Sequence, residues 1–140
     1  MLTITRKFEF SASHRYWVDS WSARENERVF GEGVSPYGHG HNYELHVSVS
    51  GPVDANTGMI INLSSLKKIV NGILNDFDHK FLNLDNAQFK KRQPSTENIA
   101  LVLFKLIDEK LSAQKDVVLQ RVRLYERHDI YAEVWREEEQ

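Results

Sequence analysis

Histidine is the residue most able to do chemistry in this sequence, because the chain has six histidines and no cysteine. Without cysteine, the chain can form no disulfide, thiolate-bound metal site, iron–sulfur cluster or thiol nucleophile. Any metal must therefore be held by imidazole and carboxylate groups. His39 and His41 stand two residues apart, so on an extended backbone their side chains point to the same side.

The elements around this pair add a third histidine. Residues 2–16 alternate apolar and polar side chains, which predicts a half-buried strand with His14 on its apolar face. Residues 41–50 alternate in the same way, and His39 and His41 continue their apolar face. If the two strands pair in antiparallel, the three imidazoles meet at one rim of the sheet. Three neutral imidazole nitrogens with an open fourth position are typical of a catalytic Zn²⁺ site, although exposed strands often carry a histidine pair without metal.

The remaining elements predict how this sheet is covered. Apolar residues recur at three- and four-residue steps over 63–77 and 96–111, which predicts two amphipathic helices. Residues 117–126 and 130–136 predict two more strands around a tight turn. This order indicates an α+β fold in one domain, residues 1–140, with a four-stranded antiparallel sheet and both helices on one face. The second face and both edges stay open, and oligomerisation is the simplest cover for them.

Composition excludes several classes of function. The net charge of −2 offers no electrostatic footprint for nucleic acid or an anionic membrane. The longest apolar run covers residues 99–104, far short of the roughly 20 residues that a membrane span needs. The first residues lack the apolar core of a signal peptide, so we expect a cytoplasmic protein. Residues 17–38 show no period, which is typical of a functional or disordered loop, but their four aromatic residues argue against disorder.

The sequence resembles the 6-pyruvoyltetrahydropterin synthase family, which includes the 6-carboxytetrahydropterin synthases. The motifs that carry the resemblance follow one another in the family's order: SASHR at 11–15, GHGHNY at 38–43, GMIINL at 58–63, DHK at 78–80 and PSTEN at 94–98. The resemblance implies a tunnelling fold, in which three subunits close their sheets into a barrel and two trimers commonly stack. We therefore expect a homotrimer or a homohexamer.

The resemblance also implies a cofactor and a substrate. His14, His39 and His41 would hold Zn²⁺, and the substrate would be 7,8-dihydroneopterin triphosphate, whose side-chain hydroxyls approach the metal. Bound Zn²⁺ polarises a substrate oxygen and lowers the pKa of a coordinated hydroxyl. A basic run, 90–92, could meet the triphosphate together with Lys80, although a solvated charge run is the plainer interpretation.

Five further residues match functional positions of the family. Thr96, Glu97 and Glu126 match positions that contact the pterin, and a carboxylate suits the two parallel N–H donors of that ring. Asp78 and His79 match a proton-relay pair, in which a carboxylate orients an imidazole. Without the resemblance, the plainer interpretations are helix capping, a surface carboxylate at the strand end and a loop after the first helix.

The chain departs from the family pattern at one position. The family's presumed general base is a cysteine a few residues before the H-G-H block, and Gly33 stands there with Glu32 beside it. We favour Glu32 as the replacement base, with Glu25 and Glu27 as weaker candidates. A relative with glutamate in place of the cysteine releases 6-hydroxymethyl-7,8-dihydropterin. The alternative is an altered or inactive member that only binds pterin and zinc. If the rest of the site is intact, Gly33→Cys should restore the usual chemistry.

Overall fold

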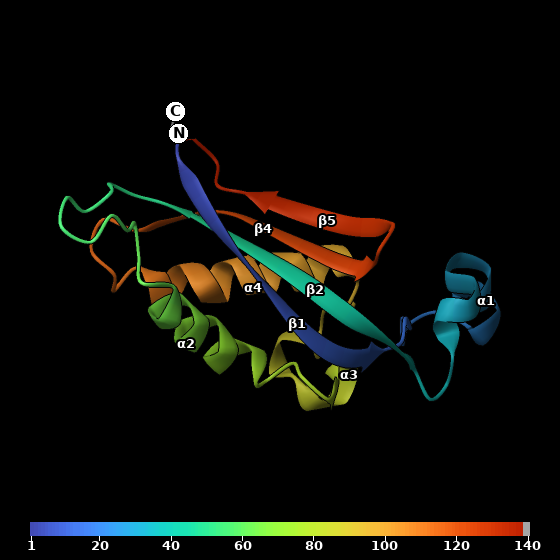
Figure 1. Ribbon diagram of the computed structural model, residues 1–140. Helices are drawn as coiled ribbons and strands as arrows, with labels where there is room; N and C mark the ends of the chain where they lie inside the picture. The colour runs from blue at the N-terminus through green and yellow to red at the C-terminus, as the bar shows by residue number, and fades with distance from the viewer. Residues whose placement is uncertain (139–140) are drawn as a thin grey trace.

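The computed structural model describes residues 1–138 (Figure 1). Its strands are β1 (Thr3–His14), β2 (His39–Ser50), β3 (Lys80–Phe81), β4 (Val118–Arg127) and β5 (Ile130–Trp135). Its α-helices are α1 (Ala23–Phe30), α2 (Leu63–Leu74), α3 (Leu82–Asp85) and α4 (Thr96–Leu111). Two short 3-10 helices are η1 (Gly31–Val34) and η2 (Ala87–Phe89). No helix in the described range is both long and apolar enough to cross a membrane.

The strands form one sheet in the order β3-β1-β2-β4-β5, and the α+β fold predicted from the sequence is confirmed. The long strands pair in antiparallel, as predicted. The fifth strand was not predicted. It is a two-residue segment, Lys80–Phe81, that pairs in parallel with Ala12 and Ser13 of β1. Two residues are too few to show an alternating pattern, so periodicity could not reveal this strand.

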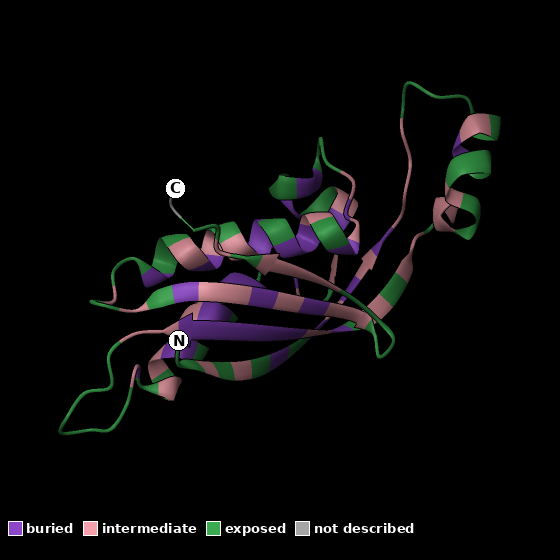
Figure 2. Ribbon diagram, turned by 90° about the horizontal axis from the view of Figure 1, so that it is seen from above, coloured by how far each residue is buried: buried purple, intermediate pink, exposed green. Residues whose placement is uncertain are grey.

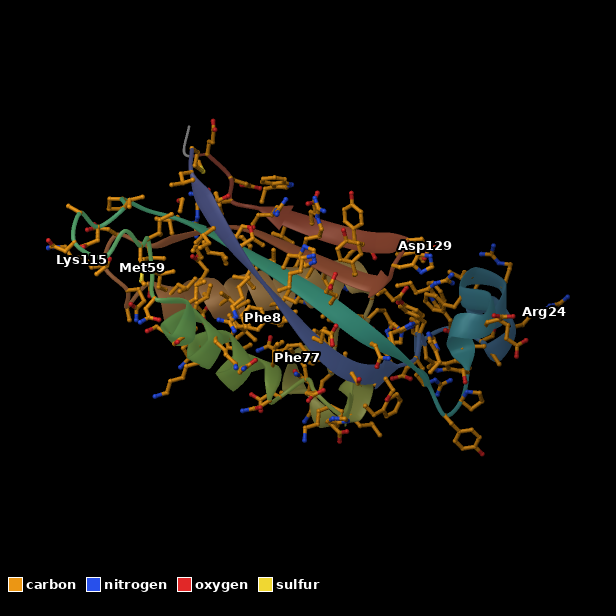
Figure 3. All side chains as sticks on the ribbon, in the orientation of Figure 1. Phe8, Arg24, Met59, Phe77, Lys115 and Asp129 are labelled. Atoms are coloured by element: carbon orange, nitrogen blue, oxygen red, sulfur yellow. The ribbon has the colours of Figure 1, made fainter. Side chains whose placement is uncertain are left out.

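The core lies between the sheet and the layer of α2 and α4, as Figures 1 and 2 show. Strand alternation turns Phe8 of β1 and Leu45 of β2 inward, and their side chains are buried. Figure 3 shows Phe8 and Phe77 in this layer, while Arg24 on α1 lies at one end of the molecule and Lys115 at the other. Burying these apolar side chains anchors the ends of β1 and β2 that carry the histidines.

Both long helices begin at the residues that the sequence favours. Asn62 Oδ1 accepts a hydrogen bond from Ser64 N at 2.9 Å and caps α2. Ser95 Oγ accepts one from Asn98 N at 3.1 Å and caps α4. The predicted end of the first helix at residue 77 is wrong, because α2 ends at Leu74. Backbone hydrogen bonds of turns follow α2, and Phe77 in this segment is buried in the core.

The segment 17–38 contains regular structure that the sequence did not predict. Ser22 caps the helix α1, and η1 follows it directly. Asn26 is buried and holds Val18 through both of its backbone groups, at 2.7 and 3.1 Å. Five of the eight residues of α1 are polar, and its three apolar residues do not recur at three- and four-residue steps, so the helix shows no apolar stripe. Figure 1 shows α1 apart from the helix layer, at the end where β1 finishes and β2 begins.

Candidate functional site

The three histidines meet where the ends of β1 and β2 pair. The register places His14 opposite His39 and Ala12 opposite His41, so all three imidazoles lie on the face that the helices cover. His14 Nε2 lies 3.0 Å from His39 Nε2 and 3.1 Å from His41 Nε2. One ligand atom from each histidine lies within 4.8 Å of the other two. The convergence expected from the alternation is confirmed.

This cluster has the geometry and protonation that a metal requires. Three nitrogens on a tetrahedral Zn²⁺ lie about 3.3 Å apart, which is close to the two distances above. His14 Nδ1 lies 2.5 Å from Pro94 O, which can only accept, so Nδ1 carries the proton. The Nε2 lone pair of His14 is therefore free to bind a metal, and the hydrogen bond to Pro94 O fixes the orientation of the imidazole ring. The donor set fits zinc.

Burial favours the neutral, ligand-competent form of two of these histidines. The pKa of His14 lies below its ordinary value, chiefly because burial desolvates the imidazolium and secondarily because His39 and His41 are near. Burial likewise lowers the pKa of His41, against the opposing effect of the Glu126 carboxylate. Imidazole must be deprotonated at the coordinating nitrogen to bind a metal, so the fold prepares the site at neutral pH.

Glu126 of β4 lies beside the cluster. Its Oε1 is 3.4 Å from His41 Nε2 and 3.7 Å from His14 Nε2. Its side chain is 15% exposed, so the interpretation as a surface carboxylate at the strand end is wrong. An inward carboxylate beside three imidazoles can accept hydrogen bonds from a ligand that enters the site.

The start of α4 and two tyrosines complete this region. Thr96 is buried, and Glu97 lies in the first turn of α4. The ring of Tyr16 lies 5.1 Å from that of His14. Burial and the carboxylates of Glu126 and Glu97 raise the pKa of Tyr16 to about 12, which keeps its phenol protonated. The hydroxyl of Tyr43 is buried and has no partner in the part of the chain that the structure describes.

Sequence reasoning missed three of these contributors: Pro94, Tyr16 and Tyr43. Both tyrosines stand two residues after a histidine of the cluster, Tyr43 within β2 and Tyr16 just beyond the end of β1, and this spacing was the available signal. Pro94 contributes a backbone carbonyl, which no pattern of side chains could reveal.

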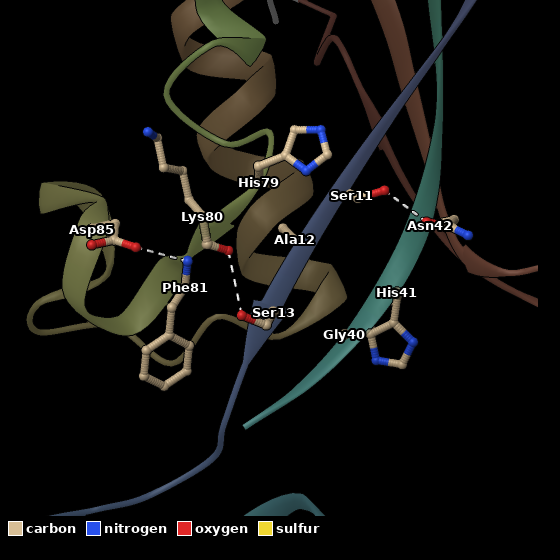
Figure 4. A pocket seen from close by; sticks show the side chains of 10 residues that line it. All are labelled: Ser11, Ala12, Ser13, Gly40, His41, Asn42, His79, Lys80, Phe81 and Asp85. Atoms are coloured by element: carbon tan, nitrogen blue, oxygen red, sulfur yellow. Dashed lines mark hydrogen bonds between the residues drawn. The ribbon is translucent and has the colours of Figure 1, made fainter. Parts of the chain in front are cut away.

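Asp78 and His79 lie at a different place, on the loop before β3. His79 lines an open cavity of about 590 Å³ that His41 also borders (Figure 4), and Asp78 directly precedes His79 in the chain. His79 is 82% exposed, and its Nε2 lies 3.6 Å from Asp78 Oδ2, beyond hydrogen-bond distance. Asp78 Oδ1 instead accepts a hydrogen bond from Ser11 N at 2.9 Å. The structure therefore brings the two side chains near each other, but not into a hydrogen-bonded relay.

Glu32 and Gly33 lie in η1. Glu32 is exposed, and its carboxylate makes no hydrogen bond or ion pair within residues 1–138. Gly33 O accepts a hydrogen bond from Tyr16 N at 2.8 Å, and a Cβ built on Gly33 would lie 2.7 Å from Tyr16 Cδ2. A side chain at this position would have to displace Tyr16, and whether Gly33→Cys restores the usual chemistry stays a prediction.

The chain was compared with known families, proteins and structures. A family model described as 6-pyruvoyl tetrahydropterin synthase matches residues 3–137. The 6-pyruvoyl tetrahydrobiopterin synthase of Pongo abelii is 40% identical over 124 residues, covering 88% of this chain and 83% of that protein. The structure of the Caenorhabditis elegans 6-pyruvoyl tetrahydropterin synthase matches with a TM-score of 0.90 and 32% identity, covering 97% of this chain and 96% of that one. A Pyrococcus furiosus dihydroneopterin monophosphate aldolase is 30% identical over 133 residues, covering 94% and 95%.

Proposed function

The chain belongs to the 6-pyruvoyl tetrahydropterin synthase family of pterin-biosynthesis enzymes, and from this premise we propose that it is a zinc-dependent enzyme acting on 7,8-dihydroneopterin triphosphate. The observation that carries the proposal is the cluster of His14, His39 and His41 with Glu126 beside it. Three nitrogen ligands leave a fourth position for a substrate oxygen.

In this proposal the three histidines would hold Zn²⁺, and the bound ion would supply Lewis-acid chemistry that makes a side-chain hydroxyl of the substrate more acidic. The Pro94 carbonyl fixes the orientation of the His14 ring. Glu126 accepts hydrogen bonds from the pterin ring, and Thr96 and Glu97 contact it from the start of α4. A half-buried carboxylate in this role disfavours analogues that lack the two ring donors, because it would be left unpaired.

Glu32 is the proposed base. It stands next to Gly33, whose backbone packs on Tyr16 against the histidine cluster, and its exposed carboxylate is available to a ligand. Glu32 takes the proton from the hydroxyl on the second side-chain carbon, and the bond between the first and second carbons breaks. The oxygen forms an aldehyde carbonyl, and the bonding pair enters the pterin ring system. A proton from His79 then completes 6-hydroxymethyl-7,8-dihydropterin.

The second candidate is a family member that binds zinc and pterin with altered or lost turnover. The exposed Glu32 and the separation of Asp78 from His79 favour it, since neither is held ready for proton transfer. In both cases we propose self-association as a homotrimer or homohexamer. Within residues 1–138, β5 and the part of β1 beyond its two-residue pairing with β3 leave edges open, and the face opposite α2 and α4 is uncovered.

Product analysis decides between the two candidates. Zinc-loaded protein is incubated with 7,8-dihydroneopterin triphosphate, with and without a reductant trap, and the products are identified by mass spectrometry. The enzyme proposal predicts 6-hydroxymethyl-7,8-dihydropterin and a phosphorylated two-carbon aldehyde in equal amounts. Unchanged substrate, bound at one per site, would establish the binding protein instead. A Glu32→Gln protein that turns over normally would remove Glu32 from the mechanism.

A further inference from the structure

The hydroxyl of Tyr43 is a buried polar group that the chemistry above does not use. Tyr43 lies on β2, two residues after His41, and its side chain is 0% exposed. Its hydroxyl makes no hydrogen bond with any residue that the structure describes. A buried hydroxyl without a partner weakens a fold, because it has given up its hydrogen bonds to water and gained none in return. Such a group inside a packed core calls for a physical reason.

The ring of Tyr43 is held firmly, so its hydroxyl has a fixed place. The ring stacks on that of Phe10, which lies directly opposite on β1, with the two centres 4.9 Å apart and the planes at 10°. Its centre is also 5.6 Å from the ring centre of His41 and 6.4 Å from that of His14. The phenol is therefore packed directly beside the histidine cluster, and this packing prevents it from turning toward solvent.

Glu126 is the acceptor that the sheet brings to this hydroxyl. The register of β2 and β4 ends with Glu44 opposite Tyr125, so Tyr43 and Glu126 are the next residues along the two strands. Strand alternation places both side chains on the face that the helices cover. Burial, and after it the Glu126 carboxylate, raises the pKa of Tyr43, so the phenol keeps its proton and can donate it in a hydrogen bond.

The contacts of Glu126 with the histidines cannot be hydrogen bonds once a metal is bound. Its Oε1 lies 3.4 Å from His41 Nε2 and 3.7 Å from His14 Nε2, and these two nitrogens lie 3.1 Å apart within the cluster. A nitrogen that gives its lone pair to a metal carries no proton, so it has nothing to donate to a carboxylate. Glu126 then needs another donor, and the Tyr43 hydroxyl is a buried donor without a partner beside it.

We propose that Tyr43 is a positioning residue, whose hydroxyl donates a hydrogen bond to Glu126 in the metal-loaded protein and holds that carboxylate ready for the pterin ring. The inference rests on the proposed function, from which it takes the metal and the role of Glu126. The unpaired hydroxyl weakens the metal-free fold, and the hydrogen bond formed on loading reverses that effect. A carboxylate that is already held in place loses less freedom when its ligand binds, which increases the affinity.

Thermal unfolding of Tyr43→Phe, with and without saturating zinc, tests the hydrogen bond. Phenylalanine keeps the ring stacked on Phe10 and removes only the hydroxyl. Without metal, loss of an unpaired buried hydroxyl should raise the melting temperature by roughly 3–8 °C. With zinc, the same substitution should lower it relative to wild type, because the bond to Glu126 is lost. The matched control is Tyr131→Phe on β5, whose side chain is 49% exposed, and it should leave both melting temperatures unchanged.

Fluorescence titration of zinc-loaded protein with neopterin tests the positioning role. Tyr43→Phe should weaken neopterin binding roughly fivefold, while Tyr131→Phe should bind as wild type does. The substitution is then repeated in a Glu126→Gln background. If Tyr43 acts through the Glu126 carboxylate, Tyr43→Phe should cause no further loss of affinity there. An equal loss in both backgrounds would show that Tyr43 acts independently of Glu126 and would overturn the proposal.

The outcomes separate this proposal from the proposed function. If Tyr43→Phe binds neopterin as tightly as wild type, and zinc does not reverse its effect on the melting temperature, the positioning role is refuted and the proposed function stands. A Tyr43→Phe protein less stable than wild type in both states would show that the hydroxyl is already paired without metal, which also refutes the proposal. If wild-type protein binds zinc but no neopterin, the proposed function fails, and a reversal of sign with zinc would still support the bond from Tyr43 to Glu126.

Discussion

Replacing Gly33 by alanine should expose how the loop before β2 supports the histidine cluster. The new Cβ would lie 2.7 Å from Tyr16 Cδ2, 3.5 Å from Tyr16 Cε2 and 3.6 Å from Phe30 Cβ. The first distance is well inside van der Waals contact, and Tyr16 is not free to move because it stacks on Phe30 at 5.5 Å. Overpacking of this kind costs about 1–3 kcal/mol of unfolding free energy. For a chain of this size, that lowers the melting temperature by roughly 3–10 °C.

The measurement is urea unfolding of wild type, Gly33→Ala, Tyr16→Leu and the double variant. If Tyr16 is what the Cβ strikes, the double variant should recover about 1 kcal/mol relative to the sum of the single changes. Gly72→Ala is the matched control, since nothing lies within 4 Å of a Cβ there, in the last turn of α2. It should stabilise the protein by about 0.5–1 kcal/mol.

Two results would refute this reasoning. A Gly33→Ala protein as stable as wild type would show that the loop is not packed against Tyr16. A clear destabilisation that Tyr16→Leu does not relieve would show that the clash lies elsewhere. In either case, a clash with Tyr16 would give no reason to expect a Gly33→Cys substitution to disturb the site.

Three further predictions concern the site and its support. Glu126→Gln should keep the zinc content and weaken neopterin binding at least tenfold, because a charge-assisted hydrogen bond is lost. Metal analysis measures the zinc content, and fluorescence titration measures the neopterin affinity. Loss of zinc in this variant would show that Glu126 is a metal ligand instead. His14 and His41 have folded pKa values below their ordinary 6.5, so their contribution to metal-free stability is present above pH 6.5 and lost as the pH falls below it. The melting temperature of metal-free protein should therefore fall from pH 7 to pH 5, and a flat profile would contradict these shifts. Ser95→Ala removes the cap of α4 and should cost about 1 kcal/mol in urea unfolding, while a neutral result would mean that the cap is not needed.

Strand alternation and helix periodicity were enough to predict the part of the fold that matters most for the site. They placed His14, His39 and His41 on one face at one rim of the sheet. Side chains alternate between the two faces of a strand, so the apolar pattern of each strand decides which face its histidines share. They could not reveal β3, which is too short for a pattern, or α1, whose exposed helix has no apolar stripe.

The inner surroundings of the site were beyond reach of the sequence for a different reason. The Pro94 carbonyl reaches His14 only because the chain before α4 returns to β1, and the fit of Tyr16 over Gly33 depends on a loop with no periodic signal. The basic run at residues 90–92 looked like a solvated charge run. Its tertiary neighbours, Arg15 and Trp17, turn it into one wall of a cavity.

Zinc K-edge X-ray absorption of the zinc-loaded protein, with and without neopterin triphosphate, tests the central claim most directly. The three-histidine site with an open position predicts three imidazole nitrogens at about 2.0–2.1 Å plus one light ligand that changes when the pterin is added. His39→Ala, which removes one of the three nitrogens, should lower both the zinc content and the imidazole signal. A shell of four protein ligands that does not respond to the pterin, or a protein that binds no zinc at this cluster, would contradict the account.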